Sequence, residues 1–305
     1  MLNVLFQMTG LILCGIGWRI LQPDGLAPVQ TRKVLTSLVY YLLLPALVLS
    51  VLWQAELGET SLLIAAAAAA GIAAGFAFGF LSCRFCRNSS QEAGAVILAV
   101  AFPNTTYLGL PVLEATFGPW ARSVAIQYDL FACTPLLFTA GVLMAARLGS
   151  AEGGHRSLAY GLLRIPAMWA AVLAVAFNGF AVPMPAVLEG LLSLLERGVV
   201  PLMLFSLGLS LEWRQSRWSL LPSLVPVVLL RLFVIPAFVL LVVTMLGLTG
   251  DLKAAVVMEA AMPSMVIGIV LCDRFKLDVG LYAAAVTVTT VLSLLTLPMW
   301  FGWLG

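Results

Sequence analysis

Charged residues are scarce in this sequence, and their scarcity excludes an ordinary soluble fold. Asp, Glu, Lys and Arg make up 10% of the 305 residues, whereas 62% are hydrophobic. Soluble domains carry about 25% charged residues. The net charge is only +2, so we expect no nucleic-acid partner. The composition therefore indicates an integral membrane protein with many helices.

Histidine and acidic clusters are equally rare, which argues against an enzyme or a metalloprotein. The one histidine, His155, lies in a polar stretch, where it completes neither an H-E-x-x-H motif nor a Ser–His pair. Cys83 and Cys86 form a C-x-x-C motif, but neither a second cysteine pair nor a nearby histidine accompanies it. We therefore expect no catalytic residue, no metal and no cofactor.

Hydrophobic segments of about 20 residues, the length that crosses a bilayer, fit into the chain ten times. The connections are short, and the longest polar one, residues 147–157, follows the fifth segment. We therefore predict an all-α integral membrane protein with ten transmembrane helices. They cover residues 2–21, 34–53, 60–82, 92–117, 121–146, 158–181, 187–211, 219–247, 252–272 and 279–302, and the fourth and ninth are expected to be broken.

Basic residues in the connections predict the orientation, because Lys and Arg accumulate on the cytoplasmic side of a membrane. Most of them follow odd-numbered segments, whereas the connections after even-numbered segments carry only Arg122 and Lys253. We therefore predict a multi-pass protein of the plasma (inner) membrane with both termini on the non-cytoplasmic side.

Two pairs of motifs indicate an internal repeat. Pro45–Ser50 in the second segment matches Pro201–Ser206 in the seventh, and Ala101–Asn104 in the fourth matches Ala261–Ser264 in the ninth, at nearly equal offsets. An odd number of helices in each copy gives the copies opposite orientations, which is the inverted repeat of secondary transporters. The two five-helix copies comprise residues 1–147 and 158–305.

Prolines interrupt the fourth segment within the stretch Ala101–Pro111. Because proline has no N–H and clashes with the carbonyl four residues earlier, Pro103 releases the carbonyl of Ala99, and Pro111 releases that of Tyr107. Broken backbone at membrane depth is tolerated where it is buried in protein or lines a wet cavity. The break therefore indicates a ligand site, and the alternative is a proline kink without a ligand.

The ninth segment is expected to break at Pro263, so that two broken helices cross near the bilayer midplane. The N-terminus of a half-helix carries roughly half a positive charge and free N–H groups, which favour an anion. Asn104, Thr105 and Ser264 either cap these ends or bind a carboxylate. Because neither break contains Lys or Arg, we expect dipoles and neutral donors to hold the anion.

Three ionisable residues lie deepest within the apolar segments: Asp129, Arg231 and Glu259. A charge at the bilayer centre costs about 2.5–3.5 kcal/mol on insertion scales, so such residues are usually paired or functional. We predict coupling or gating roles for all three, and the alternative for Glu259 is a structural pair with Arg231. The coupling ion, H⁺ or Na⁺, is left open.

Several segments resemble the auxin efflux carrier family, over nearly the whole chain. They are Phe102–Val112 with Phe117–Gly118, Val200–Leu211, Ala260–Ser264, Leu271–Phe275 and Thr290–Pro298. The resemblance implies the fold of the bile acid–sodium symporters, with ten spans, an inverted repeat and crossed helices 4 and 9. It also implies a scaffold of helices 1, 2, 6 and 7, a moving core of helices 3, 4, 5, 8, 9 and 10, and a homodimer formed through the scaffold.

The resemblance further implies that the substrate binds at the crossover. The family's role falls on Asn104, Thr105, Thr106, Gly109, Pro111, Pro263 and Ser264, to which we add the neighbours Pro103, Tyr107 and Met265 and the repeated serines Ser50 and Ser206.

These features together predict a secondary active transporter for a small organic anion. A mono- or dicarboxylate or an auxin-like acid is expected, moved by elevator-type alternating access, with the direction and the individual substrate left open. The alternative is a channel or a non-transporting membrane sensor of the same fold.

Overall fold

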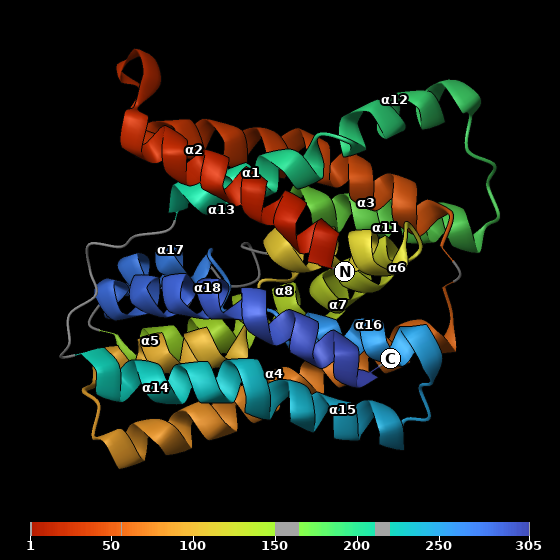
Figure 1. Cartoon of the computed structure of the whole chain (residues 1–305). Coiled ribbons are helices and arrows are strands. Elements are labelled where there is room, and N and C mark those ends of the chain that lie inside the picture. Colours follow the sequence, from red (N-terminus) through yellow and green to blue (C-terminus); the bar gives the residue numbers. More distant parts are fainter. Residues whose placement is uncertain (1, 56, 150–164, 211–219, 305) are drawn as a thin grey trace.

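The computed structural model describes residues 2–55, 57–149, 165–210 and 220–304. Within these ranges every regular element is a helix, as predicted, and no β-strand is formed. Figure 1 shows one group of helices at the top of the molecule and a second group below it.

The upper group contains the first helices of the chain and those between residues 166 and 210. It consists of α1 (Leu2–Leu21), α2 (Pro28–Leu38), η2 (Val39–Leu43), α3 (Leu44–Trp53), α11 (Pro166–Gly179), α12 (Ala186–Glu196) and α13 (Val199–Ser210), with the short η1 (Pro23–Gly25) between α1 and α2. Helix α1 packs on α13 at two glycines, because a methyl group on Gly15 or Gly208 would overlap the backbone of the facing helix.

The lower group contains the remaining helices, and among them α6–α8 lie toward the upper group in Figure 1. Its elements are α4 (Glu59–Cys86), α5 (Ser90–Ala101), η3 (Thr105–Gly109), α6 (Leu110–Phe117), α7 (Ala121–Tyr128), η4 (Asp129–Cys133), α8 (Thr134–Leu136), η5 (Leu137–Gly141), α9 (Val142–Leu148), α14 (Leu221–Leu229), η9 (Leu230–Val234), α15 (Ile235–Met245), α16 (Gly250–Ala260), α17 (Gly268–Phe275) and α18 (Val279–Leu304). Gly75 brings α4 against the end of α5, since a methyl group there would lie 2.5 Å from Ala101 Cα.

Four of the prolines within the apolar helices are preceded by π-helical turns. The turns η2, η3, η4 and η9 end two residues before Pro45, Pro111, Pro135 and Pro236, respectively. In each of them the residue before the proline donates its N–H five residues back instead of four. The wider turn relieves the clash and the lost hydrogen bond that proline imposes on a regular helix.

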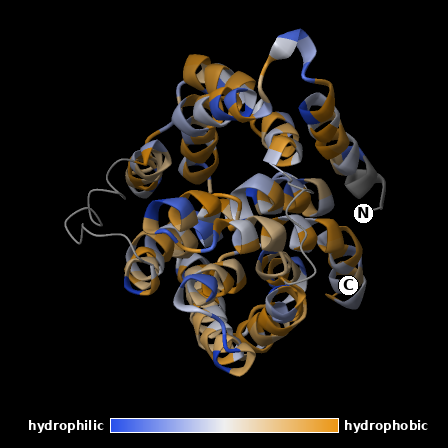
Figure 2. Ribbon diagram, turned by 90° about the vertical axis from the view of Figure 1, so that its left-hand side faces the viewer, coloured by the Kyte–Doolittle hydropathy of each residue, from blue (hydrophilic) through white to orange (hydrophobic). Residues whose placement is uncertain are grey.

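In the described part of the chain, six helical runs are long and apolar enough to cross a membrane: Pro28–Trp53, Glu59–Cys86, Ala121–Leu148, Ala186–Ser210, Leu221–Met245 and Val279–Leu304. Shorter apolar helices cover Gln7–Leu21, Ser90–Ala101 and Pro166–Gly179. Figure 2 shows hydrophobic residues over much of the outside of the helices. The chain is therefore a multi-pass membrane protein, whereas the ten spans and the inverted repeat remain predictions.

The two predicted breaks are present, and they lie side by side. Helix α5 ends at Ala101, and the helix resumes at Thr105. Helix α16 ends at Ala260, and α17 begins at Gly268. A short antiparallel bridge joins the breaks at Pro103 and Ser264. Its hydrogen bonds run from Asn104 N to Pro263 O at 2.8 Å and from Met265 N to Phe102 O at 3.0 Å.

Candidate functional site

The carbonyl that Pro103 releases is bonded by a side chain from the other break. Ser264 Oγ donates to the Ala99 oxygen at 2.8 Å, and Ser264 N donates to Thr289 Oγ1 at 3.2 Å. The hydroxyl therefore joins the two breaks. The prediction that Ser264 caps the second half of the ninth helix is wrong, because the N-cap residue of α17 is Ile267.

Arg231 joins the C-terminal ends of both interrupted helices. From η9, its NH1 donates to Val100 O at 2.9 Å and to Ala101 O at 3.4 Å, and its NH2 donates to Ala260 O. C-terminal helix ends carry partial negative charge, so a buried guanidinium stabilises both of them. Among the described residues Arg231 forms no ion pair, so the alternative pairing with Glu259 is not what the structure shows.

Two buried carboxyl groups contact the π-helical turn η3. Asp129 accepts hydrogen bonds from Thr106 Oγ1 and, at 3.1 Å, from Thr134 Oγ1. Glu259 is fully buried, and neither of its carboxyl oxygens has a hydrogen-bond partner in the described part of the chain. It lies against Gly109, where an added methyl group would be 2.7 Å from the carboxyl carbon. Glycine is therefore the residue that fits between η3 and this carboxyl group.

A cavity of about 80 Å³, here called the inner cavity, lies beside the fourth-helix break. Predicted residues that line it are Asn104, Thr106, Tyr107, Asp129 and Met265. The rest of its wall is mainly apolar and consists of Val39, Tyr40, Leu44, Leu130, Thr134, Leu137, Phe138, Ile165, Ala167, Met203 and Ile267. Among the described residues no Lys or Arg lines it, and Asp129 is the one acidic residue in its described wall.

Asn104, in the wall of this cavity, has an unused donor. It occupies the N-cap position of η3, as predicted, but its side chain makes no capping bond. The side chain is 1% exposed, and Nδ2 has no partner among the described groups. Leaving a buried donor unpaired costs about 1–3 kcal/mol. Such a group is expected where a ligand completes the hydrogen bonding.

A larger cavity of about 460 Å³, here called the outer cavity, shares Tyr40, Tyr107 and Ile267 with the inner one. Ser206 lines the outer cavity, and its buried hydroxyl has no partner in the described part of the chain. The remaining predicted residues line neither cavity. They are Ser50, Pro103, Thr105, Gly109, Pro111, Pro263, Ser264, Glu259 and Arg231.

Three further residues of the cavity walls were not predicted from the sequence: Tyr40, Thr134 and, in the outer cavity, Arg32. Tyr40 and Thr134 are polar groups in apolar segments close to a proline, and that pattern was the available signal. In the sequence, Arg32 is only one of the basic residues in the connections that predict the orientation.

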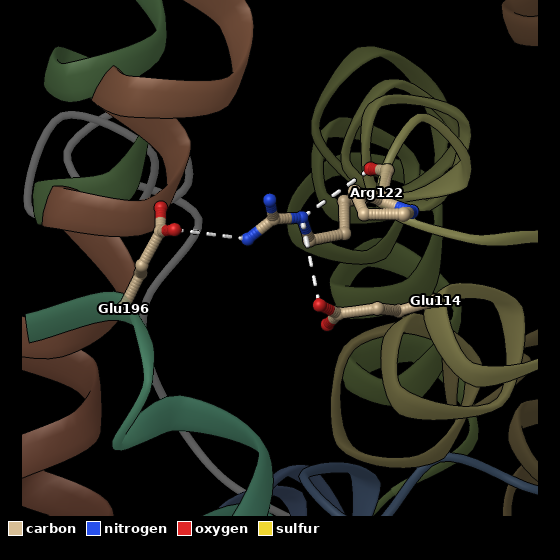
Figure 3. A network of polar contacts seen from close by, with 4 residues as sticks. Glu114, Arg122 and Glu196 are labelled. Carbon is tan, nitrogen blue, oxygen red and sulfur yellow. Dashed lines mark hydrogen bonds and ion pairs between the residues drawn. The ribbon is translucent and has the colours of Figure 1, made fainter. Parts of the chain in front are cut away.

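A cluster of charged residues connects the two groups of helices near a third cavity. Figure 3 shows Arg122, from α7, between Glu114 of α6 and Glu196 of α12. Arg122 NH1 lies 3.1 Å from Glu196 Oε1, and Arg122 Nε lies 3.8 Å from Glu114 Oε1. The three residues and Pro111 line this cavity, which has a volume of about 490 Å³. The two ion pairs of Arg122 link α12 of the upper group to α6 and α7.

Comparisons with known proteins identify the family. The profile of the membrane transport protein family matches residues 8–301. An uncharacterized transporter of Methanothermobacter thermautotrophicus is 30% identical over 293 residues, which cover 95% of this chain and 94% of that protein. The uncharacterized transporter YfdV of Escherichia coli K12 is 23% identical over 230 residues, covering 74% and 73%. A probable auxin efflux carrier component 5b of Oryza sativa is 25% identical over 241 residues, 66% of each chain. These relatives are transporters and not enzymes, and the chain belongs to the membrane transport protein family, that of the auxin efflux carriers.

Proposed function

We propose that this protein is a secondary active transporter for a small organic anion, which binds in the inner cavity beside the paired breaks. The observation that supports this most strongly is the buried, unused amide donor of Asn104 in the wall of that cavity. A neutral donor at a helix start suits a carboxylate that must be released again, because it binds without the strength of a full ion pair.

The charges around the breaks favour an anion at this place. Arg231 occupies the negative C-terminal ends of α5 and α16. The first N–H groups of a helix have no partner within it and carry partial positive charge. Residues at the start of η3, Asn104 and Thr106, line the inner cavity. Because Arg231 occupies the C-terminal ends, a ligand in the inner cavity meets the partial positive charge of a helix N-terminus.

Asp129 suggests how binding is coupled to an ion. Its carboxyl group lines the same cavity, so an anionic substrate and an ionised Asp129 repel each other at close range. A proton or a sodium ion bound with the substrate removes this repulsion. We therefore assign coupling to Asp129 and Glu259, the two buried acids that contact η3.

The two groups of helices suggest an elevator mechanism. In this proposal α1–α3 and α11–α13 form the scaffold and the homodimer interface, and the other helices move with the substrate. The Arg122–Glu196 ion pair holds the groups together at one end of the molecule, while the outer cavity adjoins the substrate site toward the other. The proposed orientation places both termini on the non-cytoplasmic side of the plasma membrane.

The test begins with a thermal-shift screen of mono- and dicarboxylates and indole acids on the purified protein, with and without sodium. The compounds that stabilise the protein are then measured in proteoliposomes for saturable uptake and counterflow. Asn104→Ala is expected to abolish uptake while folding is retained, and Asn88→Ala, outside both cavities, serves as the matched control.

Wild-type uptake by Asn104→Ala would remove the inner cavity from the transport route. Flux without saturation or counterflow would identify a channel instead. Binding of a carboxylate without any flux would identify a sensor.

A further inference from the structure

We propose that Arg32 forms a second carboxylate-binding site in the outer cavity. The anion occupies this site before it reaches the inner cavity or after it leaves the inner cavity. This inference rests on the proposed function and adds a residue that determines affinity and anion preference. Arg32 lies on α2, far along the chain from the breaks.

The two cavities are adjacent, and this makes the outer one a path to the inner one. They share the side chains of Tyr40, Tyr107 and Ile267 in their walls. The outer cavity has about 460 Å³ of space, against about 80 Å³ for the inner one. An anion that moves between the inner cavity and the outer cavity therefore passes these three side chains.

Arg32 is the one Lys or Arg in the described walls of the two cavities, and no described Asp or Glu lines the outer cavity. Its side chain is half-buried and has neither a hydrogen bond nor an ion pair with any described residue. In contrast, Arg231 and Arg122 are both bonded to protein oxygens. A guanidinium group with no acceptor among the described residues is suited to bind a carboxylate with two parallel hydrogen bonds.

Several residues with hydroxyl groups line the same cavity as Arg32. Ser37, Tyr40 and Tyr41 lie on the α2–η2 run, and Ser206 faces them from α13 with a buried Oγ that has no partner among the described residues. These groups donate hydrogen bonds to an oxyanion without adding charge. Their presence beside one cation distinguishes this wall from an ordinary basic helix end.

The competing interpretation is that Arg32 binds a lipid headgroup or only fixes the topology. The chain supplies a matched control in Lys33, which has the same charge on the same helix. Lys33 is exposed and lines neither cavity. Neighbouring residues on a helix point in directions about 100° apart. A topological or lipid role is shared by both residues, whereas a role in the cavity belongs to Arg32 alone.

The first experiment measures the electrostatic potential of the outer cavity and requires no transport. Ser37→Cys places a thiol in the wall of the outer cavity. Two methanethiosulfonate reagents, the anionic ethylsulfonate and the cationic ethyltrimethylammonium, are then reacted with this thiol. Mass spectrometry of the peptide that contains position 37 gives the rate of modification by each reagent. Adding Arg32→Gln should lower the anionic-to-cationic rate ratio roughly fivefold, the equivalent of about 1 kcal/mol. Adding Lys33→Gln should leave the ratio within twofold, and Arg32→Lys should preserve most of it.

Equal effects of Arg32→Gln and Lys33→Gln would overturn the proposal. The measurement is made in detergent, in phosphatidylcholine vesicles and in vesicles that contain phosphatidylglycerol. An Arg32 effect that appears only with phosphatidylglycerol would assign the residue to a lipid phosphate and would also overturn the proposal.

The second experiment uses the native Ser37 and a transported carboxylate from the screen. Arg32→Gln should raise KM about tenfold, the equivalent of about 1.4 kcal/mol, and leave kcat within twofold. An unchanged KM, together with an inactive Asn104→Ala, would overturn this inference while the proposed function stands. A raised KM in Arg32→Gln with a fully active Asn104→Ala would support the Arg32 site and overturn the role of the inner cavity.

Discussion

Replacing Arg231 with methionine should loosen both interrupted helices at once. The guanidinium group is 1% exposed and bonds three backbone oxygens, those of Val100, Ala101 and Ala260. Two of these oxygens end α5, and the third ends α16. Methionine has a similar length and fills the space, but it donates no hydrogen bond. The substitution therefore tests the bonds rather than the packing.

The size of the effect depends on the carbonyl groups that lose their donor. A buried acceptor without a partner costs about 1–3 kcal/mol, and the Ala101 contact, at 3.4 Å, is already long. Counting the two shorter bonds at the lower end gives a loss of about 2 kcal/mol. Removal of a buried charge offsets part of any larger loss, because its desolvation cost disappears as well. We therefore expect a fall in melting temperature of about 4–8 °C.

The assay is thermal unfolding of the purified protein, with carboxylate uptake in proteoliposomes as the second measurement. Arg84→Met, an exposed arginine at the end of α4, controls for the loss of one positive charge. Arg231→Lys should recover only part of the stability, because an ammonium group lacks the planar fork that reaches two helices. An Arg231→Met protein that melts and transports like the wild type would refute the role assigned to this residue.

Three further predictions concern the acids and the contacts around η3. Gly109→Ala should cost about 1–3 kcal/mol by overpacking, measured by thermal unfolding, while Gly10→Ala, with no atom near the added methyl, should be neutral. Glu259→Gln should remove the dependence of uptake on a pH gradient, and an unchanged pH profile would leave this carboxyl group a structural role. Glu196→Gln should break the ion pair of Figure 3 and shift the conformational equilibrium at least about fivefold, since exposed pairs contribute about 0.2–1 kcal/mol and this pair is partly buried. Cross-linking between α6 and α12 measures that shift, with Glu189→Gln on the exposed side of α12 as the control.

The positions of the two breaks could be predicted from the sequence, because proline acts locally. Pro103 and Pro263 each end a helix within two or three residues, and no distant contact is needed for that effect. The partner of the released Ala99 carbonyl could not be predicted in the same way. It is Ser264, whose sequence context suggested a cap for its own helix. The antiparallel bridge between the breaks brings Ser264 to the Ala99 carbonyl.

The role of Arg231 was missed for a related reason. Sequence shows that the residue lies at membrane depth, and an acid at similar depth is the obvious partner. Its actual acceptors are backbone oxygens on two other helices, and a backbone oxygen carries no sequence signal. Arg32 shows the reverse error. In the sequence it is only one of the basic residues in the connections, whereas the cavity beside it is formed by residues from several distant segments.

The π-helical turns connect these separate observations. Tyr40, Asp129 and Arg231 lie in η2, η4 and η9, and the start of the site itself is η3. Each of these turns is fixed by the proline two residues beyond its end. A π turn adds one residue to the helix and so rotates the remainder of that helix by about 100° relative to a regular one. Helices that must be apolar toward lipid can thereby direct a single polar side chain inward at a chosen depth. Proline thus has two effects in this protein: it breaks two helices to expose their ends, and it widens others to bring charged and polar groups to those ends.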